Sequence, residues 1–226
     1  MICARHSRTI FQLSKQSSLR RLAVNRISNV TDKPIIHGLV LAGGKSRRMG
    51  SDKALLMQDG QSQLSIAIAT LSRALPKVFV SARKDQVDET ERRKFEQIVD
   101  RYDDLGPVAG ILSAMESDAT VSWLVLACDL PNVDDATIAD LVAAHTGEHP
   151  FTAYKSSRDG LPEPLCAIFS GNSRPIVEAF VADGMVCPRK MLIRSDTFLL
   201  EQSNPASLDN MNTPEDLEGT DVSFAS

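Results

Sequence analysis

Residues 35–41 read IIHGLVL and pass directly into residues 42–53, which read AGGKSRRMGSDK. The first stretch is a short apolar run bounded by glycines, the pattern of a strand that is buried on both faces of a parallel sheet. Short apolar runs and segments with helical spacing then alternate along the chain, which predicts one three-layer α/β/α domain with a mostly parallel, Rossmann-like sheet. Further strands are expected at residues 78–81, 97–100, 121–128, 151–154 and 164–169, and helices at residues 64–75, 87–97, 109–116, 134–145 and 173–182.

The composition is that of a globular chain with a buried core. Its 226 residues suit one α/β domain, and 42% of them are hydrophobic. The longest apolar stretches, such as residues 123–128, are far shorter than the roughly 20 residues that cross a bilayer, so no membrane contact is expected. The four cysteines contain no CxxC pair, which favours reduced thiols and a cytoplasmic protein.

Charge separates the first 33 residues from the rest. Residues 1–31 carry six basic side chains and no acid, whereas the remainder holds 19 basic and 29 acidic residues. Residues 1–33 therefore predict a disordered, dispensable N-terminal extension, either a transit peptide or sequence translated from an early start codon, before a domain at 34–226. An acidic body repels a phosphate backbone, which argues against nucleic acid as a partner.

The loop after the first strand has the residues of a phosphate site. Gly43 and Gly44 let the backbone approach a ligand and direct its N–H groups inward. Arg47, Arg48 and Lys53 add three cations within seven residues. The spacing differs from the P-loop and from the GxGxxG fingerprint, and taken alone it also fits a glycine-rich turn with a solvated basic face.

Four segments together resemble one family. Residues 41–53 resemble the LAGGxSxRMGxDK signature of the molybdenum cofactor guanylyltransferases, the MobA-like family of nucleotidyltransferases. Residues 106–111, 128–131 and 210–217 resemble the family's GPLAGI, CDxP and NVNTPEDL segments, in the same order. The resemblance implies a nucleotide-diphospho-sugar transferase-like fold. It also implies that GMP is transferred from GTP to the phosphate of a molybdopterin-type cofactor, with Mg²⁺ present and pyrophosphate released.

The resemblance assigns catalysis to three residues. Asp129 follows the expected strand at 121–128, and ligands of open α/β sheets bind at the carboxyl ends of strands. From the residues alone, Asp129 is either a magnesium ligand or a turn residue before Pro131; the resemblance favours the metal. Arg47 and Lys53 would grip the triphosphate and neutralise charge at the α-phosphorus.

The nucleotide contacts follow from the same resemblance. Gly44 favours GTP over CTP, because related cytidylyltransferases tend toward LAAG at this point. Asp100 matches a nucleotide-contacting position, although it also fits a loop cap, and Ser81 stands where the family often has an Asn. The expected nucleotide-binding residues are Leu41, Ala42, Gly43, Gly44, Lys53, Ser81, Asp100 and Asp129.

The acceptor side carries a weaker pattern. Asn212 is expected to face the site, and Arg189 and Lys190 either bind the acceptor's phosphate or form the exposed basic end of a helix. Transient contacts with proteins that donate or accept the cofactor are also expected. Two other functions stay open: a CTP-dependent enzyme acting on molybdopterin or on a sugar or polyol phosphate, and a non-catalytic nucleotide-binding carrier.

Overall fold

The structure is a computed structural model that describes residues 33–44, 52–210 and 222–223. Apart from Lys33, these residues belong to one compact unit, Pro34–Ser226. The expected N-terminal extension, Arg47 and Asn212 lie outside the described residues. Within the described ranges, no helix is long and apolar enough to cross a membrane.

A seven-stranded sheet forms the centre of this unit, in the order β5-β4-β1-β6-β8-β7-β9. All neighbouring strands pair in parallel except β8, which is antiparallel to both β6 and β7. This arrangement confirms the mostly parallel α/β sheet predicted from the sequence. The strands are β1 Ile36–Leu41, β4 Val78–Ala82, β5 Gln97–Val99, β6 Ser122–Ala127, β7 Phe151–Lys155, β8 Pro162–Phe169 and β9 Thr197–Leu200.

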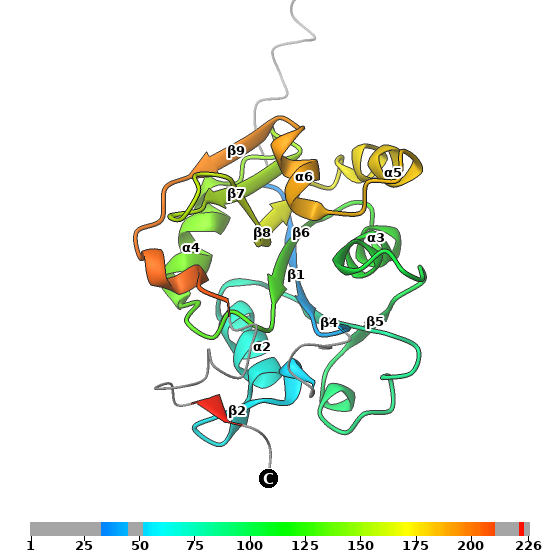
Figure 1. Ribbon diagram of the computed structural model, residues 1–226, viewed down its shortest axis with the longest axis vertical. Coiled ribbons are helices and arrows are strands. Elements are labelled where there is room, and N and C mark those ends of the chain that lie inside the picture. The colour runs from blue at the N-terminus through cyan, green and yellow to red at the C-terminus, as the bar shows by residue number, and fades with distance from the viewer. Residues whose placement is uncertain (1–32, 45–51, 211–221, 224–226) are drawn as a thin grey trace, which may run out of the picture. The chain divides into compact units, whose positions relative to one another are not determined.

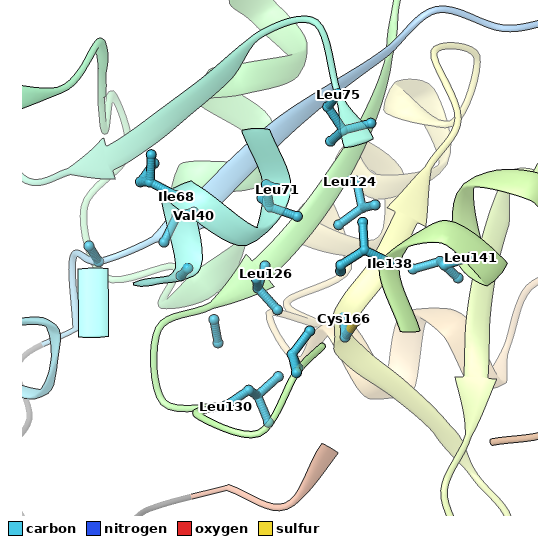
Figure 2. Packing of buried hydrophobic residues seen from close by; sticks show 14 of the residues in the cluster. Val40, Ile68, Leu71, Leu75, Leu124, Leu126, Leu130, Ile138, Leu141 and Cys166 are labelled. Carbon is cyan, nitrogen blue, oxygen red and sulfur yellow. The ribbon is translucent and has the colours of Figure 1, made fainter. Parts of the chain in front are cut away.

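Helices cover both faces of the sheet (Figure 1). Side chains of β1 alternate between the faces, so Val40 joins one apolar cluster and Leu39 joins the other, and both are fully buried. Figure 2 shows the first cluster, in which Leu71 and Ile138 approach the sheet. The helices are α2 Gln63–Ala74 and α4 Asp135–Ala144 on this face, with α3 Pro107–Ser117, α5 Arg174–Ala182 and α6 Pro188–Ile193 on the other.

Several short elements accompany the main sheet. A small antiparallel sheet is formed by β10 Val222–Ser223, β2 Met57–Gln58 and β3 Gln61–Ser62. The short 3₁₀ helices are η1 Lys53–Leu55, η2 Arg92–Lys94 and η3 Pro205–Leu208.

The helix expected at residues 87–97 is wrong. This stretch contains turns and the three-residue η2, and then enters β5. One of its charged side chains, Arg92, is fully buried, and Glu89 accepts the backbone N–H groups of Glu91 and Arg92, whereas Arg93, Lys94 and Glu96 remain exposed. The elements α6 and β9 were not expected from the sequence.

Candidate active site

The carboxyl ends of four parallel strands meet at one edge of the sheet. Leu41 at the end of β1 lies opposite Ser81 of β4 and Ala127 of β6. Because β8 runs the other way, it begins at this same edge, with Cys166 opposite Leu126. The segments that leave or enter the sheet here therefore surround one region, the place where open α/β sheets bind ligands.

Lys53 and Asp129 meet at this edge, although 76 positions separate them in the chain. Lys53 Nζ donates to Asp129 Oδ2 at 3.0 Å, and the two side chains are 16% and 20% exposed. Lys53 opens η1, and Asp52 caps that helix by accepting the backbone N–H of Ala54 at 3.1 Å. Asp129 follows Cys128, whose N–H bonds the carbonyl of Leu41 at 3.5 Å just past the end of β6. The fold thus brings together two of the three expected catalytic residues; their catalytic roles stay predictions.

Asp129 has a free carboxylate oxygen suited to a cation. Its Oδ1 is buried and has no hydrogen-bond partner among the described residues. Buried polar atoms are normally paired, so an unpaired carboxylate oxygen indicates a ligand that completes it. Within the described ranges, no group of three or more His, Cys, Asp or Glu side chains could hold a metal. Mg²⁺ often uses only one or two protein carboxylates and takes its other ligands from phosphate and water, so this donor set fits it.

Ser81 and Asp100 form a second polar pair beside the loop after β1. Ser81 Oγ donates to Asp100 Oδ1 at 2.7 Å. Burial raises the pKa of Asp100, against the opposing effects of the Ser81 hydrogen bond and the Arg83 charge. The Ser81 hydroxyl donates its hydrogen bond to Asp100 and so is not available as a donor to a nucleotide base. An Asn at this position would offer an amide donor in its place.

Two glycines allow close approach around this pair. A Cβ atom on Gly43 would lie 3.2 Å from Asp100 Oδ2, so the loop backbone passes directly beside the carboxylate. A Cβ atom on Gly110 would lie 2.3 Å from Ser81 Oγ, which explains the glycine in α3 by packing alone. At Gly44 an added Cβ would meet nothing within 4 Å among the described atoms, so the close approach is a property of Gly43.

Two arginines at this edge were missed by the sequence analysis. Arg83 Nη1 donates to the carbonyl of Gly43, and Arg92 Nη2 donates to the carbonyl of Ala42. Both arginines lie between β4 and β5: Arg83 directly follows β4, and Arg92 falls in the stretch at residues 87–97 that was expected to be a helix. The only sequence signal for either one was its place shortly after a strand that ends at this edge.

A cavity of about 260 Å³ opens on the β8 side of the same edge. Arg189 lines it from the first turn of α6 and donates to Asp159 Oδ2 at 3.0 Å, Glu163 Oε1 at 3.3 Å and the Pro162 carbonyl at 3.0 Å. The expectation of an exposed helix end therefore describes only Lys190, which is exposed and not part of the cavity wall. The cavity is lined by Leu130, Ser156, Arg158, Asp159, Glu163, Pro164, Leu165, Cys166, Arg189, Leu208 and Asn210.

Comparison with known proteins identifies the family. Residues 38–198 match the MobA-like NTP transferase domain. This chain belongs to the MobA-like NTP transferase family. A molybdenum cofactor guanylyltransferase of Rhizobium johnstonii is 34% identical over 206 residues, covering 82% of this chain and 91% of the relative.

Two other similar proteins extend the comparison. A molybdenum cofactor biosynthesis bifunctional protein of Synechocystis sp. is 35% identical over 189 residues, covering 84% of this chain but only 54% of the relative. The MobA-like chain thus spans about half the length of that protein. The crystal structure of molybdopterin-guanine dinucleotide biosynthesis protein A from Archaeoglobus fulgidus superposes with a TM-score of 0.68 at 24% identity, covering 80% of this chain and 95% of the other, which shows a shared fold.

Family membership makes this chain a nucleotidyltransferase, and several of the residues predicted to bind its nucleotide lie at the carboxyl edge. The expected backbone contacts of Leu41, Ala42 and Gly43 lie there, between β4 and β6. Cys128, beside Asp129, does not offer a nucleophile, because burial raises the pKa of its thiol to about 12.

Proposed function

We propose that this MobA-like chain transfers GMP from GTP to the phosphate of a molybdopterin-type cofactor and releases pyrophosphate. The observation that carries the proposal is the contact between Lys53 Nζ and Asp129 Oδ2 at 3.0 Å, beside an unpaired and buried Asp129 Oδ1. A cation donor and an anionic metal ligand are the two components that phosphoryl-type transfer requires of a protein. The names of the Rhizobium johnstonii and Synechocystis sp. relatives support the choice of substrates.

Asp129 and Lys53 have different roles in neutralising the negative charge of the triphosphate. Asp129 would hold Mg²⁺ through Oδ1, and the metal would act as a Lewis acid toward the phosphate oxygens. Lys53 exchanges its contact with Asp129 for a phosphate oxygen and neutralises charge as the α-phosphorus is attacked. Arg47, in the same loop but outside the described residues, is proposed to hold the leaving pyrophosphate.

Asp100 supports GTP as the nucleotide. An ionised carboxylate only accepts hydrogen bonds, and the guanine edge offers two adjacent donors, on N1 and on the 2-amino group. Asp100 Oδ2 lies beside Gly43, where the backbone contacts to the nucleotide are expected. Cytosine places an acceptor next to its amino group, so the same carboxylate disfavours CTP.

The cavity beside Leu130 would receive the acceptor. Arg189 is the cation placed to bind its phosphate, after exchanging Asp159 or Glu163 for that anion. An oxygen of the acceptor phosphate attacks the α-phosphorus in line, a new P–O bond forms, and the bond to the β-phosphate oxygen breaks. The acceptor phosphate is already ionised at neutral pH, so no general base is needed to activate it.

Pyrophosphate release tests this proposal. The purified chain is incubated with Mg²⁺ and GTP, CTP or ATP, with and without molybdopterin-type cofactor. The proposal expects release only with GTP and the cofactor together. Release with CTP would instead establish a cytidylyltransferase, and GTP binding without release would establish a carrier. We place the activity in the cytoplasm, because Cys128, Cys166 and Cys187 are free thiols. We also propose transient contacts with the proteins that donate and accept the cofactor.

A further inference from the structure

The arginine at position 92 is the largest charged side chain that the structure buries completely. Its relative exposure is 0%, and its guanidinium contacts the carbonyl of Ala42, just past the end of β1. Nη1 donates to Glu89 Oε2 at 3.1 Å, and Nε has no acceptor among the described residues. The guanidinium is therefore fixed through its two terminal nitrogens.

One of those nitrogens reaches both ends of the loop. Arg92 Nη2 donates to the carbonyl of Ala42, the first residue after β1, and to Asp52 Oδ2 at 2.8 Å. Ala42 and Asp52 flank the segment expected to hold the triphosphate. A single buried nitrogen thus ties the start of the loop to its end.

The contact between Arg92 and Asp52 also affects the position of Lys53. Asp52 uses Oδ2 for Arg92 and Oδ1 for the backbone N–H of Ala54, which makes it the cap of η1. Lys53 is the first residue of that short helix, so the direction of its side chain toward Asp129 depends on how Asp52 is held. Gln86 Nε2 adds a longer contact, 3.4 Å, to Asp52 Oδ2.

The segment that carries Arg92 is itself anchored. Burial alone would raise the pKa of Glu89. Its carboxylate, however, accepts hydrogen bonds from the backbone N–H groups of Glu91 and Arg92 and from the Arg92 guanidinium, and these hold the pKa below its ordinary value. Glu91 accepts the hydroxyls of Ser62 and Ser65 at 2.7 Å each, at the start of α2. Arg92 therefore enters the core from a turn fixed on both of its sides.

Stability alone does not account for this arrangement. Burying a guanidinium has a large desolvation cost, and buried ion pairs can often be replaced by apolar residues without loss of stability. We propose that Arg92 is a positioning residue, which clamps Ala42 to Asp52 and thereby sets Lys53 for the triphosphate. This inference rests on the proposed function, because it assigns the clamp to the same nucleotide site.

The test compares Arg92→Gln in two backgrounds, the native chain and Lys53→Met. GTP dissociation constants are measured with Mg²⁺ by NMR titration of the full chain, which also reads weak binding. If Arg92 acts through Lys53, Arg92→Gln weakens GTP binding about tenfold in the native background and less than about twofold beside Lys53→Met. An equal loss in both backgrounds, or no loss in the native one, would overturn the proposal.

Two further variants serve as a substitute for Arg92→Gln and as a control. Asp52→Asn retains an oxygen for the η1 cap but removes the anionic partner of Arg92, so it should show the same dependence on Lys53 and replaces Arg92→Gln if that variant fails to fold. Arg174→Gln breaks ion pairs with Glu116 and Glu178 on α3 and α5 and should leave GTP affinity unchanged. Absence of GTP binding by the native chain would defeat the proposed function and this inference together, whereas native binding with unchanged variants defeats only the clamp.

Discussion

The two halves of the sheet, on either side of β6, hold their cations in different ways. In the half formed by β1, β4 and β5, Arg92 is fully buried and Lys53 contacts Asp129 across the edge. In the half formed by β8, β7 and β9, the cavity arginines are neutralised by nearby carboxylates: Arg158 by Asp209 at 2.6 Å, and Arg189 by Asp159 and Glu163. Both halves pair their cations with carboxylates, but among the residues named here only Arg92, in the first half, is completely buried.

This difference implies different costs of binding. The side chains of Arg189, Asp159 and Glu163 are 32%, 41% and 20% exposed, and such partly solvated pairs contribute only about 0–1 kcal/mol each. A phosphate can therefore replace these carboxylates at little cost. The triphosphate, in contrast, would bind where Arg92 already holds the backbone carbonyl of Ala42 and the side chain of Asp52 in place. We infer that nucleotide recognition is preorganised and that acceptor recognition depends on an exchange of partners.

The largest effect is expected where the two halves meet. Asp129→Asn keeps the size of the side chain but removes the anionic charge, and should lower kcat about 10³-fold. Thermal unfolding should stay close to that of the native chain. The exposed Asp135, which pairs with Arg73 on α2, provides the control: Asp135→Asn should leave kcat unchanged. An Asp129→Asn enzyme with native kcat would remove this residue from the chemistry.

A smaller effect should be confined to the acceptor half. Arg189→Gln removes one of the two arginines that line the cavity, and KM for the molybdopterin-type acceptor should rise about tenfold, as expected for one lost charge-assisted hydrogen bond. KM for GTP should not change. Steady-state kinetics with each substrate varied in turn measure both values, and Arg174→Gln again serves as the control. Equal changes in both KM values would show that the two halves do not bind separate substrates.

The smallest effect concerns Asp100 in the nucleotide half. Burial raises the pKa of this carboxyl, so the folded chain holds its proton more tightly than the unfolded chain does, and stability falls as pH rises from the ordinary value of 3.8 through the folded pKa. Asp100→Asn should remove this penalty and be slightly more stable than the native chain at pH 7, with no gain below pH 3.8. Urea denaturation at several pH values measures the difference.

The same Asp100 variant separates stability from binding. GTP affinity should fall although the fold becomes slightly more stable, because the carboxylate acceptor for the base is lost. In the same titrations, the ratio of the CTP dissociation constant to the GTP dissociation constant should decrease. A variant that loses stability at neutral pH, or keeps its full preference for GTP, would contradict the role assigned to Asp100.

The part of the fold set by parallel strands could be predicted from sequence. Apolar runs at residues 36–41 and 122–127 are long enough to identify β1 and β6, and parallel pairing brings their carboxyl ends together. That rule and the roles that the family resemblance implies together predict that Lys53 and Asp129 share a site. The four resembling segments added the identities of the substrates.

The rest depends on interactions that a local pattern does not contain. Residues 87–97 have the composition of a solvated helix, and only the contacts of Arg92 with Ala42 and Asp52, 50 and 40 positions away, reveal an inward turn. The reversed direction of β8 is visible in its antiparallel pairing with β6, a contact between strands about 40 positions apart in the chain. The helix α6 spans only six residues, less than two turns, and in β9 the apolar side chains of Phe198 and Leu199 are exposed, so neither element shows a clear period.

One diffraction experiment tests the central claim most directly. Crystals of the chain grown with GTP and with Mn²⁺ in place of Mg²⁺ would be measured at the manganese absorption edge. The account predicts an anomalous peak beside Asp129 Oδ1 and a triphosphate oxygen within hydrogen-bond reach of Lys53 Nζ. Manganese and triphosphate bound away from the edge shared by β1 and β6 would contradict it.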